Sequence, residues 1–264
     1  MTEIERLQMN ANQANSDFMA IKNKIVEKGV DIADGTRTAE YASKVDGVYE
    51  KGYEQGYKEA WRYVGQLNNS FANVTFPDGY EMSISVPSRN SANLNQVIYS
   101  AKGLRKLTIK DSPIADVKSY FGFGFCTSIE EIDLSNFVQG GGAVVVTDAS
   151  YLFYGDTKLR VILGELDFST GVGLSTVFTT CNALEEVRLG GVLEQNGFDI
   201  HWSPKLSKAS ITSIIEHLST TTSGLTVTLS KTAVENAFGS TESTEWTTLI
   251  SSKSNWTISL VQGV

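Results

Sequence analysis

The chain has 264 residues, of which 41% are hydrophobic, so it can bury one large core or two modest ones. A formal net charge of −8 and a pI near 4.9 argue against binding to nucleic acid, whose phosphate backbone requires clustered Lys and Arg. The longest apolar run, residues 143–146, is far too short to span a bilayer, and the first residues lack the pattern of a secretion signal. We therefore expect no nucleic-acid partner, no membrane partner and synthesis in a cytoplasm.

Apolar residues within positions 1–28 recur with the alternating spacing of a coiled-coil seam. A single helix of this length is marginal in water, so we expect residues 1–28 to self-associate. Ile at both a and d positions favours a trimer. The alternative is an amphipathic helix that folds back on its own domain. The seam residues are Ile4, Leu7, Ala11, Ala14, Phe18, Ile21 and Ile25.

Residues 29–61 have the pattern of a short helical module. Gly29 suits the end of the first helix, and Thr38 suits the N-cap of the next. From Tyr49 to Trp61 an aromatic residue recurs every four positions, which places these rings on one helix face. We interpret this stripe as a packing surface.

Two segments in this region, 28–36 (KGVDIADGT) and 53–60 (YEQGYKEA), together with Glu40-Tyr41-Ala42, resemble the N-terminal segment of structural proteins of phages that infect Gram-positive bacteria. In those proteins a short helical module, often preceded by a coiled coil, attaches the chain to the virion. The resemblance covers residues 1–60. It implies that residues 29–61 contact other virion proteins.

Beyond residue 71 the apolar residues alternate, as in a half-buried strand. Pro77-Asp78-Gly79 separates the alternating runs 74–76 and 82–86, and this tripeptide is typical of a turn or hairpin. We expect a β cap that shields the first of the repeats that follow.

One pattern, F-x-x-C-x-x-L-x-x-V-x-L, recurs through the middle of the chain and is clearest from Phe178 to Leu189. Its copies start at positions 98, 123, 153, 178 and 200, at steps of 25, 30, 25 and 22 residues. A period of this size predicts a leucine-rich-repeat solenoid. The predicted fold is therefore α+β, with a coiled-coil helix (1–28), a helical attachment module (29–61), a leucine-rich-repeat solenoid with an N-terminal β cap (62–206) and an α/β C-terminal cap (207–264).

The repeats resemble the BspA-like leucine-rich-repeat family, most closely in segments 147–159 (TDASYLFYGDTKL) and 166–169 (LDFS). Segments 132–137 and 181–184 are also similar to the family pattern. Asp156 stands where the family has Cys or a small residue, so we expect that repeat to be looser. The family occurs in bacterial surface adhesins, protist surface proteins and phage appendages, so the resemblance implies recognition without naming a target.

The tail, residues 207–264, predicts alternating helices and strands. Ser207 can cap a helix that runs to Leu218, and residues 225–229 and 256–260 alternate as strands. Between those strands, Ser230 can open one helix and Trp246 marks another.

Residue types that carry chemistry do not converge in the sequence, which shows no nucleotide loop, nucleophile elbow or metal-ligand spacing. Cys126 and Cys181 hold the same position two repeats apart, roughly 10 Å at strand spacing, so we expect buried thiols without a disulfide. His201 and His217 are expected to be structural. The acidic pairs 130–131 and 185–186 are interpreted as a solvated strand face.

We expect a non-enzymatic protein of a phage virion, without cofactors, placed in a tail, baseplate or head appendage or fibre and assembled in the host cytoplasm. Its partners would be further copies of itself, other virion proteins, and a host cell-wall or surface component. The alternatives are a bacterial surface adhesin with BspA-like repeats and, less in keeping with the residues, a cell-wall hydrolase. The candidate recognition surface consists of aromatic residues that the repeat pattern leaves on the outside: Tyr120, Phe121, Tyr151, Tyr154 and Trp202. The alternative is that these side chains only fill gaps between repeats.

Overall fold

A computed structural model describes residues 72–85, 92–93, 97–110, 116–118, 122–138 and 141–262. These residues belong to the second of two compact units, Trp61–Val264. The predicted attachment module 29–61 lies outside the described residues. So do the predicted coiled-coil residues Ile4, Leu7, Ala11, Ala14, Phe18, Ile21 and Ile25.

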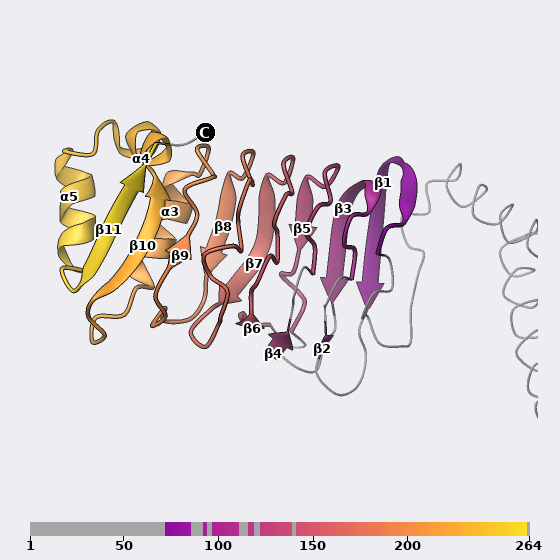
Figure 1. Ribbon diagram of the computed structural model, residues 1–264, viewed down its shortest axis with the longest axis horizontal. Coiled ribbons are helices and arrows are strands. Elements are labelled where there is room, and N and C mark those ends of the chain that lie inside the picture. The colour runs from indigo at the N-terminus through magenta and orange to yellow at the C-terminus, as the bar shows by residue number, and fades with distance from the viewer. Residues whose placement is uncertain are drawn as a thin grey trace, which may run out of the picture. The chain divides into compact units, whose positions relative to one another are not determined.

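Parallel strands form an eight-stranded sheet with two arms (Figure 1). One arm runs in the order β1-β3-β5-β7 with β8 paired to β7, and the other runs β6-β4-β2; the arms join where β6 pairs with β7. The strands of the first arm are β1 (Thr75–Ser85), β3 (Lys102–Lys110), β5 (Glu131–Asp133), β7 (Val161–Asp167) and β8 (Glu186–Leu189). Those of the second are β2 (Ala92–Asn93), β4 (Asp116–Lys118) and β6 (Val144–Asp148).

Strand register in the first arm follows the sequence repeat. Leu107 of β3 lies opposite Ile132 of β5, which lies opposite Ile162 of β7. Val161 of β7 lies opposite Glu186 of β8. These partners are 25, 30 and 25 residues apart, which are the steps of the recurring pattern. Residues at equivalent positions of the pattern are therefore neighbours in space.

The predicted fold class, α+β with an N-terminal coiled coil and a leucine-rich-repeat solenoid, is wrong. The described residues form mostly parallel sheets with three short helices, which is an α/β sheet fold, and they include no N-terminal coiled-coil helix. A leucine-rich repeat follows its strand with a helix or a 3₁₀ turn. Here the connections are irregular turns, and the short strands β2, β4 and β6 pair in parallel with one another. The spacing of apolar residues did not distinguish a leucine-rich-repeat solenoid from this sheet fold, because both bury the same positions of the repeat.

The turn or hairpin expected at Pro77-Asp78-Gly79 is also absent from the described residues. Residues 75–85, which include most of both alternating runs, form the single strand β1, and this strand pairs in parallel with β3. Its register shifts between Thr75 and Glu81, so the tripeptide forms a bulge, with Gly79 at φ 81°. Because β1 pairs with β3 along its length, both runs lie in the same edge strand of the sheet.

Phenylalanines from successive turns form a stack in the core. The rings of Phe123 and Phe153 lie 5.4 Å apart, and those of Phe153 and Phe178 are also 5.4 Å apart, with interplanar angles of 15° and 8°. All three are fully buried. Burial of each ring stabilises the fold by roughly 1.5–3 kcal/mol before entropic costs. This stack ties the turns of the first arm together.

The C-terminal part adds a three-stranded parallel sheet in the order β11-β10-β9 (Figure 1). The predicted helices and strands of this part are confirmed. Each helix begins after a serine whose hydroxyl accepts a backbone N–H bond: Ser207, Ser230 and Ser243. The elements are β9 (Phe198–Asp199), α3 (Lys208–Glu216), β10 (Leu225–Ser230), α4 (Lys231–Phe238), α5 (Thr244–Ser251) and β11 (Trp256–Val261).

Helix α3 covers the edge of the larger sheet at β8. The backbone N–H of Val187 donates to the hydroxyl of Ser210, and that of Leu189 donates to the hydroxyl of Ser213, both at 3.1 Å. The two serines are three residues apart and so share one helix face. Their hydroxyls take the place of a further strand and satisfy N–H groups that a sheet edge would otherwise expose.

Candidate functional site

In five consecutive turns, two residues follow the buried residue that opens the turn; most of them are at least partly exposed, whereas Gly124 and Gly155 are buried. We call these ten residues the outer turn positions. In chain order they are Tyr99 and Ser100, Gly124 and Phe125, Tyr154 and Gly155, Thr179 and Thr180, and His201 and Trp202.

Aromatic side chains at these positions form a row with Tyr151. The ring centroids of Tyr99 and Phe125 are 5.7 Å apart, those of Phe125 and Tyr154 are 5.1 Å apart, and those of Tyr154 and Tyr151 are 5.5 Å apart. We call Tyr99, Phe125, Tyr151 and Tyr154 the aromatic ridge. The three tyrosines are half-buried, and Phe125 is 38% exposed. The ridge therefore presents aromatic edges and faces to solvent across three turns.

The backbone of the second outer position is left-handed in four successive turns. Ser100, Phe125, Gly155 and Thr180 have φ angles of 55°, 60°, 82° and 62°. This conformation aims each amide at the following turn: the N–H of Phe125 donates to the carbonyl of Tyr154 at 2.7 Å, and that of Gly155 donates to the carbonyl of Thr179 at 3.0 Å. Left-handed backbone is a requirement of the turn stack, although it costs a non-glycine residue roughly 1–2 kcal/mol.

Glycine at the equivalent position of the next turn makes room for Phe125. A Cβ atom on Gly155 would lie 2.9 Å from Cδ1 of Phe125, closer than such atoms approach. The phenylalanine ring thus rests on a bare stretch of backbone. Contact with the backbone at Gly155 keeps the Phe125 ring in the aromatic ridge.

The structure separates the predicted recognition residues into three groups. Tyr120 and Phe121 lie outside the described residues. Tyr151 and Tyr154 are brought together in the aromatic ridge. Trp202 lies two turns beyond Tyr154, with its ring 4.8 Å from that of His201.

Sequence analysis missed two members of the ridge, Tyr99 and Phe125. Their positions carry a usable signal, because alignment of the five copies places Tyr99 with Tyr154, and Phe125 with Trp202. The left-handed backbone at the position of Phe125 has no comparable signal in the sequence, since it falls on Ser, Phe, Gly and Thr in the four turns.

A buried column runs behind the same turns. The thiol of Cys126 donates to the carbonyl of Ile98 at 2.7 Å, and the thiol of Cys181 donates to the carbonyl of Phe153 at 3.0 Å. Both cysteines are buried and free, as predicted. Burial raises the pKa of each thiol well above its usual range. Neutral, enclosed thiols of this kind act as packing groups.

Asp156 takes the place of cysteine in the turn between them. Its side chain is fully buried. One carboxyl oxygen accepts the backbone N–H of Cys126 at 2.8 Å, and the other, Oδ2, has no hydrogen-bond partner among the described residues. Burial raises the pKa of this carboxyl well above its usual range, while the Cys126 N–H bond opposes the shift.

The acidic pairs at 130–131 and 185–186 contribute to ion pairs across neighbouring strands. Glu131 pairs with Lys106 at 2.5 Å, and Glu185 pairs with Arg160 at 2.8 Å. The hydrogen bond from Arg160 lowers the pKa of Glu185. Glu185 is therefore unsuited to act as a general acid, which requires a raised pKa.

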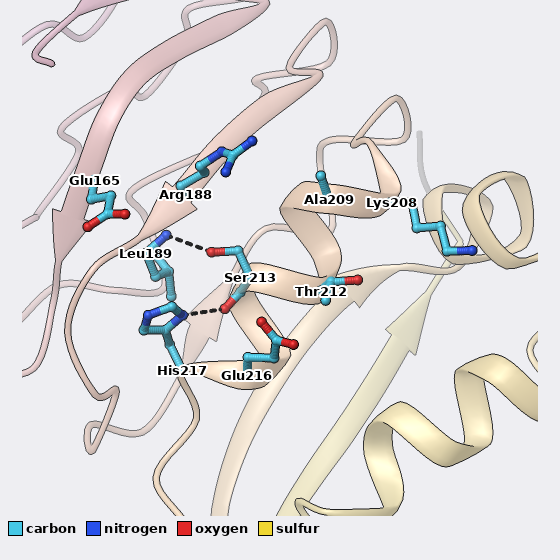
Figure 2. A pocket seen from close by; sticks show the side chains of 9 residues that line it. All are labelled: Glu165, Arg188, Leu189, Lys208, Ala209, Thr212, Ser213, Glu216 and His217. Carbon is cyan, nitrogen blue, oxygen red and sulfur yellow. Dashed lines mark hydrogen bonds between the residues drawn. The ribbon is translucent and has the colours of Figure 1, made fainter.

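An open hollow of about 610 Å³ lies where the sheet meets α3 (Figure 2). Glu165 and Arg188 approach it from β7 and β8, and Glu216 and His217 approach it from the end of α3. Nδ1 of His217 donates to the carbonyl of Ser213 at 2.7 Å, which fixes the imidazole on the helix. We interpret this hollow as the space left where the sheet packs against helix α3.

Among the helices that the structure describes, none is long and apolar enough to cross a bilayer. In the same part of the chain, no cluster of three or more His, Cys, Asp or Glu side chains could hold a metal ion.

Comparisons with models of protein families, with curated proteins and with solved structures found no match to this chain.

Proposed function

We propose that this chain is a non-enzymatic structural protein of a bacteriophage virion, in a tail, baseplate or head appendage, whose parallel-sheet body recognises a protein or host-surface component. It is assembled in the host cytoplasm and binds neither nucleic acid nor membrane. Its N-terminal helix joins it to two further copies, and residues 29–61 contact other virion proteins. The resemblance of residues 1–60 to attachment segments supports this context.

The observation that carries the recognition role is Phe125. Its ring is 38% exposed, and its backbone is left-handed at φ 60°. Glycine would relieve both costs, and the next turn has glycine at this position. Local backbone strain clusters at ligand-binding sites, and exposed apolar patches such as the aromatic ridge mark interaction surfaces.

Binding to host material tests this role. Purified full-length protein is mixed with intact Gram-positive cells and with their isolated cell walls, and the bound fraction is measured after sedimentation. We expect saturable binding that Tyr154→Ala and Trp202→Ala weaken while circular dichroism stays unchanged. Wild-type protein that binds none of these preparations would contradict the receptor role.

Self-association is tested separately by light scattering. We expect the full chain to have the mass of a trimer, and a chain that begins near Gly29 to be smaller. Two monomers would contradict the proposed attachment helix.

A further inference from the structure

We infer that the outer turn positions bind a neutral glycan chain that lies across successive turns, an inference that rests on the proposed recognition function. The ligand class follows from three features of these positions: their spacing, their chemistry and the cost of keeping Phe125.

Spacing favours a long, thin ligand. Neighbouring turns follow the strand spacing of about 4.8 Å. The ring separations of 5.7 Å for Tyr99–Phe125 and 5.1 Å for Phe125–Tyr154 follow the same repeat. Between Tyr99 and Tyr154, a chain laid along the turns meets one aromatic group at each step. A protein hot spot, in contrast, typically centres on one anchor in a compact pocket.

Aromatic groups resume after a gap of one turn. Thr179 and Thr180 lie between Tyr154 on one side and His201 and Trp202 on the other, so the aromatic groups flank a gap of roughly 10 Å, two strand spacings. The adjacency of these turns is shown by two bonds: Gly155 N–H donates to the Thr179 carbonyl at 3.0 Å, and the Ser203 hydroxyl donates to the Cys181 carbonyl at 3.1 Å. The gap offers threonine hydroxyls between two apolar platforms.

The chemistry of these positions favours a ligand without charge. From Tyr99 to Thr180 the outer turn positions contain tyrosine, phenylalanine, glycine, serine and threonine, and no ionised side chain. Nδ1 of His201 forms a hydrogen bond of 2.6 Å with Oδ1 of its neighbour Asp199. Pyranose rings combine apolar C–H faces, which stack on aromatic rings, with hydroxyls, which pair with tyrosine and threonine. Single-stranded nucleic acid also stacks on aromatic rings, but it requires a cationic groove, and this chain carries a net charge of −8.

The experiment compares isolated Gram-positive cell walls before and after periodate oxidation, which cleaves the vicinal diols of sugars. Full-length wild-type protein is titrated against both preparations, along with Phe125→Gly, Tyr154→Ala and the control Val192→Ala. Val192 is 52% exposed and lies outside the outer turn positions, so it matches the loss of exposed apolar surface. Phe125→Gly removes the ring and suits the left-handed backbone, so the fold is preserved.

We expect periodate to abolish binding, Phe125→Gly and Tyr154→Ala each to weaken it about tenfold, and Val192→Ala to leave it unchanged. Wild-type binding that survives periodate but is lost after protease treatment of the walls would overturn the glycan inference and leave recognition standing, with a wall protein as the target. Ridge variants that bind like wild type would also overturn it, because the ligand would then lie elsewhere. No wild-type binding to untreated walls or cells would instead refute the proposed function itself.

Discussion

On the inner side of the turns the residue type changes little from one turn to the next, whereas on the outer side it changes more. On the inner side, Phe123, Phe153 and Phe178 repeat one residue type in one stacked geometry. On the outer side, the equivalent turns alternate large and small residues, from Gly124 beside Phe125 to Tyr154 beside Gly155. Uniformity inside reflects close packing, which tolerates few shapes. The outer residues are free of this packing constraint, so their identity can follow the ligand that the surface contacts.

The largest expected contrast is between an inner and an outer phenylalanine. Phe153→Ala removes a fully buried ring that stacks on both neighbours, so we expect the free energy of unfolding to fall by about 3–5 kcal/mol. Phe125→Ala removes a ring that is 38% exposed, so its effect should be much smaller. Urea unfolding of both variants measures the difference. Equal losses would show that the outer ring belongs to the core.

Asp156 breaks the uniformity of the inner side, and its effect depends on pH. Because burial raises the pKa of its carboxyl, the folded protein keeps a proton that the unfolded chain releases above the usual Asp pKa of about 3.9. Its contribution to stability is therefore fully present below that pH and is lost as pH rises toward the raised pKa. We expect the contribution of Asp156 to the stability of the wild-type protein to fall as pH rises above about 4.

Replacement of this carboxyl should remove that part of the pH dependence. Asp156→Cys installs the residue found at the equivalent positions 126 and 181 and removes the acceptor of the Cys126 N–H, so we expect the pH dependence contributed by the carboxyl to disappear whatever the net change in the free energy of unfolding. Asp148→Asn is the matched control, because this half-buried carboxylate accepts the N–H of Ser150 in a surface turn. Urea unfolding across the pH range gives the slopes. The same slope in wild type and Asp156→Cys would rule out a buried, protonated Asp156.

Repeat spacing predicted which residues become neighbours, because strand register advances by the same 25, 30 and 25 residues. It did not predict the fold class. Strands β2, β4 and β6 have only two to five residues each, too few to show alternation, so the second arm of the sheet has no sequence pattern of its own. The bulge in β1 was predicted to be a turn or hairpin, because Pro-Asp-Gly is compatible with all three.

The candidate site was predictable in part. Tyr151 and Tyr154 were identified because aromatic residues that the repeat does not bury stand out in sequence. Phe125 was not, although it occupies the same repeat position as Trp202. Ser210 and Ser213 were also not singled out, because their hydroxyls bond to strand β8, and contacts between distant segments leave no local pattern.

The smallest expected effect has opposite signs at two adjacent threonines. Thr180 is β-branched and left-handed at φ 62°, whereas the described residues with positive φ do not include Thr179. Thr180→Gly relieves strain of roughly 1–2 kcal/mol and adds about 0.5–1 kcal/mol of backbone entropy to lose, so we expect a net gain of about 0.5–1 kcal/mol. Thr179→Gly adds the entropy cost alone and should destabilise by about 0.5–1 kcal/mol. Urea unfolding of both variants against wild type measures the difference. A loss at both positions would mean that the threonine side chain at 180 contributes more than its strained backbone costs, and the outer turn would then be held by side chains as firmly as the inner one.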